Sequence, residues 1–157
     1  MSKEYKVLIS DKISQKAIET LKKNNIAFDY MPDCGTSDSL IEVIEPYAGL
    51  IIRSASQVSK EVIVRAKNLQ VIGRAGIGVD NIDIKAASSK GIVVMNTPHG
   101  NAITTAEHTL AMIFAASRQI SAADQSTQKG KWEKSRFMGQ ELTGKTLGLV
   151  GVGNIGS

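Results

Sequence analysis

Three glycines in the last part of the sequence have the spacing of a dinucleotide-binding loop. They are Gly151, Gly153 and Gly156, and they directly follow the apolar run 147–150. A buried parallel strand that turns tightly into a helix needs this order. The first glycine permits the turn, the second lets the backbone approach a pyrophosphate, and the third brings the helix close to its strand. The position of the motif after an apolar run therefore predicts a dinucleotide site.

Two arginines follow apolar runs that are typical of buried strands. Arg53 comes after the run 50–52, and Arg74 comes after the run 71–73. Parallel strands of an open α/β sheet present their carboxyl ends at one edge, so both guanidinium groups are expected at that edge. A guanidinium is a planar fork of donors that suits a carboxylate or a phosphate. The pair predicts an anion site, and the simpler alternative is a pair of surface arginines.

The glycines that follow Arg74 allow two interpretations. Gly76 and Gly78 stand just before Asp80. They permit a turn into a helix whose first residues are capped by Asp80, or they expose backbone N–H groups to a substrate carboxylate.

The histidines and the cysteine indicate less chemistry. His108 lies inside a predicted helix beside Glu107 and is expected to be structural, whereas the role of His99, in a loop, stays open. Cys34 lies in a predicted turn and is expected to be inert. No metal site is predicted, because Cys34 has no second cysteine and the two histidines lack ligand spacing.

Short apolar runs alternate with amphipathic segments as far as Pro98. This alternation is typical of successive βα units and predicts an α/β fold, a doubly wound parallel sheet with the flavodoxin-like strand order. Strands are expected at 7–10, 26–30, 49–54, 69–74 and 92–96, and helices are expected to begin at Ser14, at Ser37 or Asp38, at Ser59 and at Asp80.

The segment Thr97–Gly100 is a predicted hinge, because proline fixes φ and glycine permits the next turn. It separates two predicted domains, 1–98 and 99–157. The second domain is expected to contain a long helix rich in small residues, a more polar helix, a cationic connector and then the strand of the glycine motif. These elements correspond to 102–118, 121–128, 131–136 and 146–150.

The composition excludes several classes of protein. The net charge of +4 is scattered among acids and only 4% of residues are aromatic, so a nucleic-acid partner is not expected. No apolar run reaches the roughly eighteen residues of a membrane span. The amino end lacks the features of a signal peptide, and a single cysteine fits a reducing cytoplasm.

A set of short motifs extends over nearly the whole sequence. It comprises Arg74–Asn81, Val94–Pro98, Gly100–Asn101, Ala106–Glu107, Gly130–Trp132 and Leu142–Gly156. Together these motifs resemble the D-isomer-specific 2-hydroxyacid dehydrogenases. The segments Gly130–Glu133 and Phe137–Gly139 resemble the branch of that family whose substrate carries a phosphate.

The resemblance implies NAD as cofactor, a small phosphorylated 2-hydroxy acid as substrate, and a homodimer or larger homo-oligomer. It makes 1–98 a substrate domain and 99–157 the beginning of an incomplete Rossmann domain. The catalytic arginine, glutamate and histidine of the family fall outside these residues. No residue is therefore assigned as catalytic, this chain alone is expected to be inactive, and 146–157 is expected to lack its sheet neighbours.

The resemblance also assigns site residues. Arg53 and Arg74 would hold the anionic groups of the substrate, with Gly76 and Asn101 nearby. Lys134 would reach the phosphate of a substrate in a neighbouring subunit. The cofactor would lie against Ile77 and would contact the glycine loop through Gly151, Gly153, Asn154, Ile155 and Gly156.

Three other functions are compatible with the sequence. The first is another D-2-hydroxyacid dehydrogenase that reduces glyoxylate, hydroxypyruvate or the keto acid of D-lactate. The second is a non-catalytic module that self-associates through the helix 102–118. A stand-alone flavodoxin-like binding domain is disfavoured, because 139–157 would then be an apolar tail without purpose.

Overall fold

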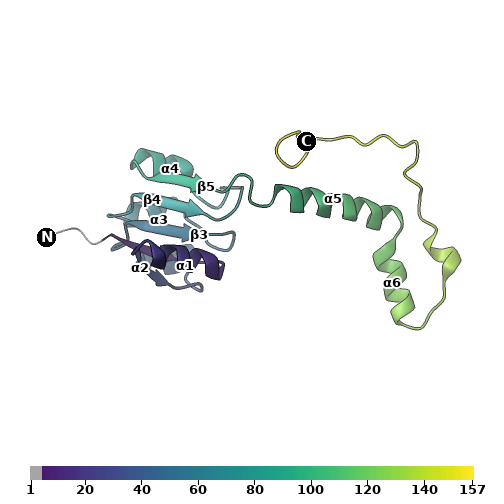
Figure 1. The fold of residues 1–157 in the computed structure, drawn as a ribbon, viewed down its shortest axis with the longest axis horizontal. Coiled ribbons are helices and arrows are strands. Elements are labelled where there is room, and N and C mark those ends of the chain that lie inside the picture. Colours follow the sequence, from purple (N-terminus) through teal and green to yellow (C-terminus); the bar gives the residue numbers. More distant parts are fainter. Residues whose placement is uncertain (1–4) are drawn as a thin grey trace. The chain divides into compact units, whose positions relative to one another are not determined.

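The computed structural model describes residues 5–157. The chain divides into two compact units, Met1–Gly100 and Asn101–Ser157. In Figure 1 the first unit is a sheet flanked by helices, and the second unit contains helices and ends in a segment without regular structure.

The first unit is built on a five-stranded parallel sheet with the order β2-β1-β3-β4-β5. This is the flavodoxin-like order, so the predicted α/β fold class is confirmed. The third strand ends earlier than predicted, because the N–H of Arg53 donates to the carboxylate of Asp11 and not to a neighbouring strand. The strands are β1 (Lys6–Ile9), β2 (Ala27–Tyr30), β3 (Gly49–Ile52), β4 (Val71–Arg74) and β5 (Val93–Asn96).

Four helices connect these strands: α1 (Gln15–Lys23), α2 (Ser37–Val43), α3 (Lys60–Arg65) and α4 (Ile84–Ser89). Ser14 and Ser59 cap α1 and α3, as predicted. Two predicted caps are wrong by a few residues. Thr36 caps α2 by accepting from the N–H of Ser39, and Asp83, not Asp80, caps α4. In both cases the side-chain oxygen of the residue just before the helix accepts a hydrogen bond from the third N–H of the helix, and this residue is therefore the cap.

The core of the first unit lies between the sheet and the helices α2, α3 and α4. Leu50, Ile52 and Ile72 of the central strands are buried, and they belong to one cluster with Leu40 of α2 and Ile63 of α3. Strands buried in this way read as continuous apolar runs, which is why their positions could be predicted.

The opposite face of the sheet is covered less completely. Successive residues of a strand point to opposite faces, so Val93 and Met95 share a face that Val94 does not. Val93 and Met95 are 57% and 59% exposed, whereas Val94 packs against the core. The face that carries Val93 and Met95 is therefore open to solvent at β5.

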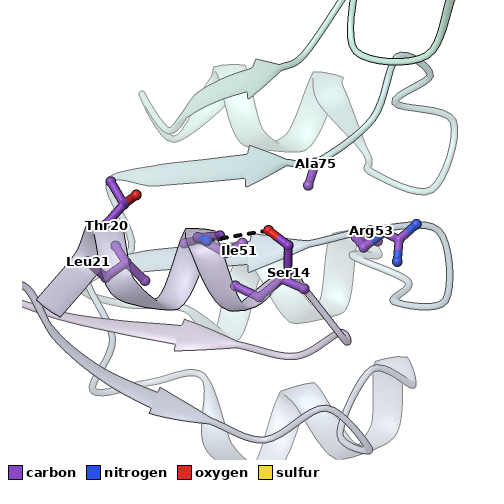
Figure 2. Close-up of a pocket in the computed structure, with 8 residues that line it drawn as sticks. Ser14, Thr20, Leu21, Ile51, Arg53 and Ala75 are labelled. Carbon is purple, nitrogen blue, oxygen red and sulfur yellow. Dashed lines mark hydrogen bonds between the residues drawn. The ribbon is translucent and has the colours of Figure 1, made fainter.

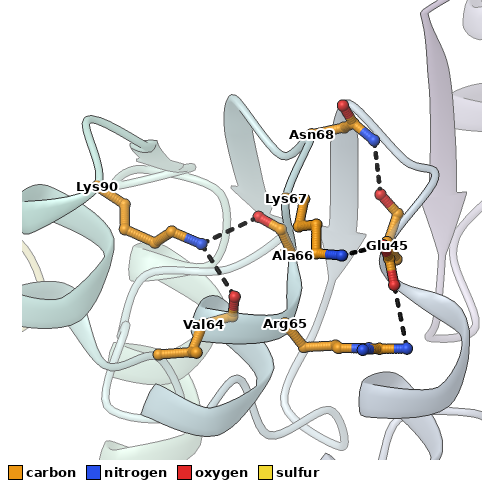
Figure 3. A network of polar contacts seen from close by, with 7 residues as sticks. All are labelled: Glu45, Val64, Arg65, Ala66, Lys67, Asn68 and Lys90. Atoms are coloured by element: carbon orange, nitrogen blue, oxygen red, sulfur yellow. Dashed lines mark hydrogen bonds and ion pairs between the residues drawn. The ribbon is translucent and has the colours of Figure 1, made fainter.

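Polar contacts tie together the connections at the amino-terminal edge of the sheet (Figure 3). Glu45 forms ion pairs with Arg65 and Lys67 at 3.0 and 2.7 Å, and its carbonyl accepts from Nδ2 of Asn68 at 2.9 Å. The ammonium group of Lys90 donates to three carbonyls at the end of α3, those of Ile63, Val64 and Ala66, at 2.8 to 3.3 Å. These carbonyls have no partner within the helix, so Lys90 acts as a carboxyl-terminal cap.

The second unit begins with α5 (Ala102–Ser117) and α6 (Ile120–Gln128), followed by a short 3₁₀ helix, η1 (Lys134–Phe137). Gln119 joins α5 to α6 in a left-handed conformation with φ of 53°. Glu133 holds the start of η1 to α6 by accepting a hydrogen bond from Ser126 Oγ at 2.6 Å. No helix within residues 5–157 is long and apolar enough to cross a membrane.

Residues 146–157 contain neither helix nor strand. Leu147, Leu149 and Val150 are exposed, although their pattern predicts a buried strand. A strand needs a neighbour to pair with, and no strand is present among the described residues of the second unit. The strand predicted at 146–150 is therefore not formed among the described residues, where the segment has no sheet neighbour.

Candidate anion-binding site

The carboxyl edge of the sheet brings two predicted site residues to neighbouring strand ends. Arg74 is the last residue of β4 and pairs in register with Ile52, the residue before Arg53. The N–H of Ala75 donates to the carbonyl of Ile52 at 2.8 Å, which continues the pairing by one more bond. Arg53 and Arg74 thus leave adjacent strands at the same edge.

The two arginines begin on opposite faces of the sheet, because side chains alternate along a strand. Arg53 is on the face of α1, where it lines a groove of about 610 Å³ with Ile51, Ala75 and residues of α1. Figure 2 shows Arg53 and Ala75 at the end of this groove where α1 begins, close to Ser14. The amino end of α1 adds a partial positive charge there, which favours an anion.

A smaller concavity of about 260 Å³ lies beside the same arginine. Lys12, Pro32, Arg53, Ser54 and Ala55 line it together with the buried Asp11. Nη1 of Arg53 donates to the carbonyl of Lys12 at 3.2 Å, and the guanidinium group is otherwise exposed. The Lys12 side chain and the Arg53 guanidinium group therefore border one small cavity.

The side chain of Arg74 folds over Gly76. A Cβ atom at position 76 would overlap Nη1 of Arg74 and would lie 3.2 Å from its Nε. Nε is buried and has no hydrogen-bond partner among the described residues. A side chain at position 76 would therefore displace the guanidinium group of Arg74, whose Nε donor has no partner among the described residues.

The backbone of Gly76 forms hydrogen bonds within the protein on both sides. Its N–H donates to the carbonyl of Arg74 at 2.9 Å, and its carbonyl accepts from Thr97 at 2.9 Å. The N–H of Gly76 is therefore used within the turn. Ile77 is fixed by Nδ2 of Asn96, which donates to the Ile77 carbonyl at 2.7 Å. The loop after β4 is bound in this way to the end of β5.

The other predicted site residues belong to the second unit. Asn101 precedes α5, and its carbonyl accepts from Thr105. Lys134 begins η1 and lines a concavity of about 690 Å³ with Arg118, Trp132 and Glu141. Residues 151–157 form a turn that the N–H of Ser157 closes on the carbonyl of Gly153 at 3.1 Å.

Two positions of the glycine motif require glycine in this structure. Gly151 has φ of +98°, in the left-handed region. A Cβ atom at Gly156 would overlap the carbonyl oxygen of Gly151. Asn154 and Ile155 lie within the same turn.

The histidines and the cysteine have no assigned role in this site. His99 and His108 are exposed. Burial raises the pKa of the Cys34 thiol, which favours its protonated form. No group of three or more histidine, cysteine, aspartate or glutamate side chains that could hold a metal occurs among residues 5–157.

Sequence comparisons identify the family. The profile of the D-isomer specific 2-hydroxyacid dehydrogenase catalytic domain matches residues 7–147. This chain belongs to that family. It is 48% identical over 151 residues to D-3-phosphoglycerate dehydrogenase of Archaeoglobus fulgidus and 47% identical over 159 residues to that of Homo sapiens. Each alignment covers 96% of this chain and 28% of the relative, so the chain spans less than a third of these proteins' length.

Solved structures agree with this fold. The 3-phosphoglycerate dehydrogenase of Entamoeba histolytica, determined with NAD⁺ bound, is 31% identical and superposes with a TM-score of 0.76 over 98% of this chain and 48% of its own. The TT0316 protein of Thermus thermophilus is 32% identical with a TM-score of 0.83, over 96% of this chain and 50% of its own.

Proposed function

We propose that the protein to which this chain belongs is an NAD-dependent D-3-phosphoglycerate dehydrogenase of the cytoplasm. It oxidises 3-phospho-D-glycerate to 3-phosphohydroxypyruvate, the entry to serine biosynthesis. The observation that carries the proposal is the placement of Arg53 and Arg74 at adjacent strand ends, in a chain 48% identical to a protein of that name.

The substrate has an anionic group at each end, a carboxylate and a phosphate, with the reacting hydroxyl between them. Arg53 and Arg74 supply two guanidinium groups from the ends of neighbouring strands. Holding both ends of the substrate fixes the position of the hydroxyl carbon, which lowers the entropic cost of the reaction. Gly76 and Asn101 are also assigned to substrate binding, and Lys134 binds the phosphate held by a neighbouring subunit.

The glycine loop is the proposed pyrophosphate site. Gly151, Gly153, Asn154, Ile155 and Gly156 are assigned to it, and Ile77 is assigned to the wall of the cofactor pocket. The glycine requirement at Gly151 and Gly156 fits this role, because a loop without side chains lets a phosphate approach backbone N–H groups. When bound, NAD accepts the hydride from the substrate carbon. The domains in this assignment are 1–98 for the substrate and 99–157 for the start of the cofactor domain.

No residue of this chain is assigned as the catalytic acid–base. We therefore expect no NADH production when the purified chain is mixed with 3-phosphoglycerate and NAD. Measurable turnover in a sample whose mass has been verified would refute this expectation.

Substrate binding tests the assignment directly. Isothermal titration of the chain with 3-phosphoglycerate should show binding that Arg53→Gln weakens by about tenfold or more, because hydrogen bonds to charged groups contribute roughly 1.5–3 kcal/mol. Arg65→Gln is the matched control, since Arg65 pairs with Glu45 at the other edge of the sheet. D-Glycerate, which lacks the phosphate, should bind more weakly. Equal affinity for both acids would favour the other branches of the family.

The apolar surface of α5 favours a second property, self-association. Leu110, Met112 and Phe114 are more than half exposed, although they are large and apolar. Exposed apolar surface of this kind is typical of an interface. The proposed assembly is a homodimer, and static light scattering that gave only the monomer mass would contradict it. A self-associating module without catalysis would show this dimer and no affinity for 3-phosphoglycerate.

A further inference from the structure

Side chains hold the loop that follows β3 by its backbone. The N–H of Arg53 donates to Oδ2 of Asp11 at 2.5 Å, and the N–H of Ser56 donates to the same oxygen at 3.2 Å. Asp11 lies just after β1 and is only 4% exposed. A carboxylate in its ionised form accepts hydrogen bonds and cannot donate, so it suits two N–H groups.

Asn81 completes the arrangement from the other side. Its Nδ2 donates to the carbonyl of Arg53 at 2.8 Å and to the carbonyl of Ser56 at 2.7 Å. The backbone of Arg53 is thus held at its N–H by an acceptor and at its carbonyl by a donor. The backbone of Ser56 is held in the same way, so one carboxylate and one amide fix both ends of the loop 53–56.

The base of this loop is buried and closely packed. Oγ of Ser56 lies 2.7 Å from Oγ of Ser10, and neither side chain is exposed. A Cβ atom at Gly35 would stand 2.8 Å from Oγ of Ser56, so position 35 has no room for a side chain. These contacts oppose a shift of Ser56 toward β1.

The exposed part of the loop is held much less. Ser54 and Ala55 are exposed, and the Arg53 side chain makes one hydrogen bond, 3.2 Å long, to the carbonyl of Lys12. The backbone is therefore fixed where it is buried, while the guanidinium group stays accessible beside a cavity of about 260 Å³. This combination is what an arginine that binds an anion requires.

We propose that Asp11 and Asn81 are positioning residues, which hold the backbone of Arg53 so that its guanidinium group meets the anionic substrate without prior ordering of the loop. The inference rests on the proposed role of Arg53 in substrate binding. A loop ordered before binding costs less entropy when the substrate binds, so loss of either residue weakens binding without removing any substrate contact.

A double-mutant cycle in the whole chain tests the proposal, with 3-phosphoglycerate as the titrant. Asp11→Asn and Asn81→Ala are each expected to weaken binding by about tenfold, because the backbone of a released loop residue must then be ordered when the substrate binds. When Arg53 is already replaced by Gln, the same changes should alter the affinity by less than about twofold, because residues that act through one another are not additive.

Two matched controls separate positioning from general loss of structure. Asp29→Asn removes a carboxylate that binds Tyr47 and Lys6, and Asn68→Ala removes an amide that donates to a carbonyl. Neither touches the loop 53–56, so neither should change the affinity. If Asp11→Asn and Asn81→Ala weakened binding equally in the chain with Arg53 and in the Arg53→Gln chain, the positioning role would be overturned. Failure of Arg53→Gln itself to weaken binding would instead refute the proposed function, and the inference with it.

Hydrogen exchange in the unmutated chain tests the arrangement without any variant. The N–H groups of Arg53 and Ser56 should exchange as slowly as those of β3, while Ser54 and Ala55 exchange at the rates of an open loop. Fast exchange at Arg53 and Ser56 would overturn the proposal, even if the Asp11 variant failed to fold.

Discussion

Replacement of Gly76 by alanine should weaken substrate binding while it changes the free energy of unfolding only a little. The new Cβ atom would overlap Nη1 of Arg74 and lie 3.2 Å from its Nε, so the arginine side chain must leave its present position. Gly76 is not among the glycines with a positive φ, so the backbone accepts alanine. Alanine at such a position stabilises by about 0.4–1 kcal/mol through the unfolded state, which offsets part of the cost of displacing Arg74.

The expected result is a free energy of unfolding within about 1 kcal/mol of the unmutated value. The affinity for 3-phosphoglycerate should fall by about tenfold or more, since a charged hydrogen bond contributes roughly 1.5–3 kcal/mol. Urea denaturation and calorimetric titration measure the two quantities on the same preparation. Gly73→Ala is the control, because its Cβ would meet only Ile51, at 4.0 Å. Unchanged affinity in Gly76→Ala would refute the claim that Arg74 binds substrate from its position over Gly76.

Three further predictions concern the rest of the chain. Hydrogen bonds from Lys6 and Tyr47 hold the pKa of Asp29 below its usual value, and burial and the bond to Asp29 raise the pKa of Tyr47 to about 12. The free energy of unfolding should therefore fall as the pH drops below about 4, and again as the pH rises from about 10 to 12. Urea denaturation midpoints measured across this pH range should show that both losses of stability are smaller in Tyr47→Phe. Lys90→Met should lower the free energy of unfolding by about 1–2 kcal/mol, because it removes three bonds to the end of α3, whereas Lys85→Met, on the exposed surface of α4, should change it little. Phe114→Glu should shift sedimentation toward the monomer, and an unaltered sedimentation profile would exclude α5 as the interface.

The sheet could be predicted from the sequence because its central strands carry buried apolar residues in short runs. Leu50, Ile52 and Ile72 lie in short apolar runs separated by polar segments, and this pattern is sufficient to give the strand order of a common α/β fold. The helix starts at Ser14 and Ser59 followed from the helical spacing of the apolar residues after them. The caps Thr36 and Asp83 were missed because several neighbouring residues offer an oxygen, and only the path of the backbone decides which one is used.

The candidate site was predicted less completely. The positions of Arg53 and Arg74 at strand ends follow from the pattern, but their opposite faces become clear only from the register Ile52 to Arg74. Asp11 and Asn81 were not found, since their partners are backbone groups 25 to 45 positions away in the sequence. One signal was available. Asp11 directly follows an apolar strand, where an acidic residue lies at the carboxyl edge of the sheet beside any site formed there.

The central claim is that the carboxyl edge of this sheet binds a phosphorylated 2-hydroxy acid. The most direct measurement is a ¹H–¹⁵N NMR titration of the chain with 3-phosphoglycerate. The largest shifts are expected at Arg53, Arg74 and Gly76, whereas Glu45, Lys67 and Lys90 at the opposite edge should stay unchanged. Binding at the carboxyl edge would be contradicted by shifts at the opposite edge. It would also be contradicted if the ligand bound but caused no shifts at Arg53 and Arg74.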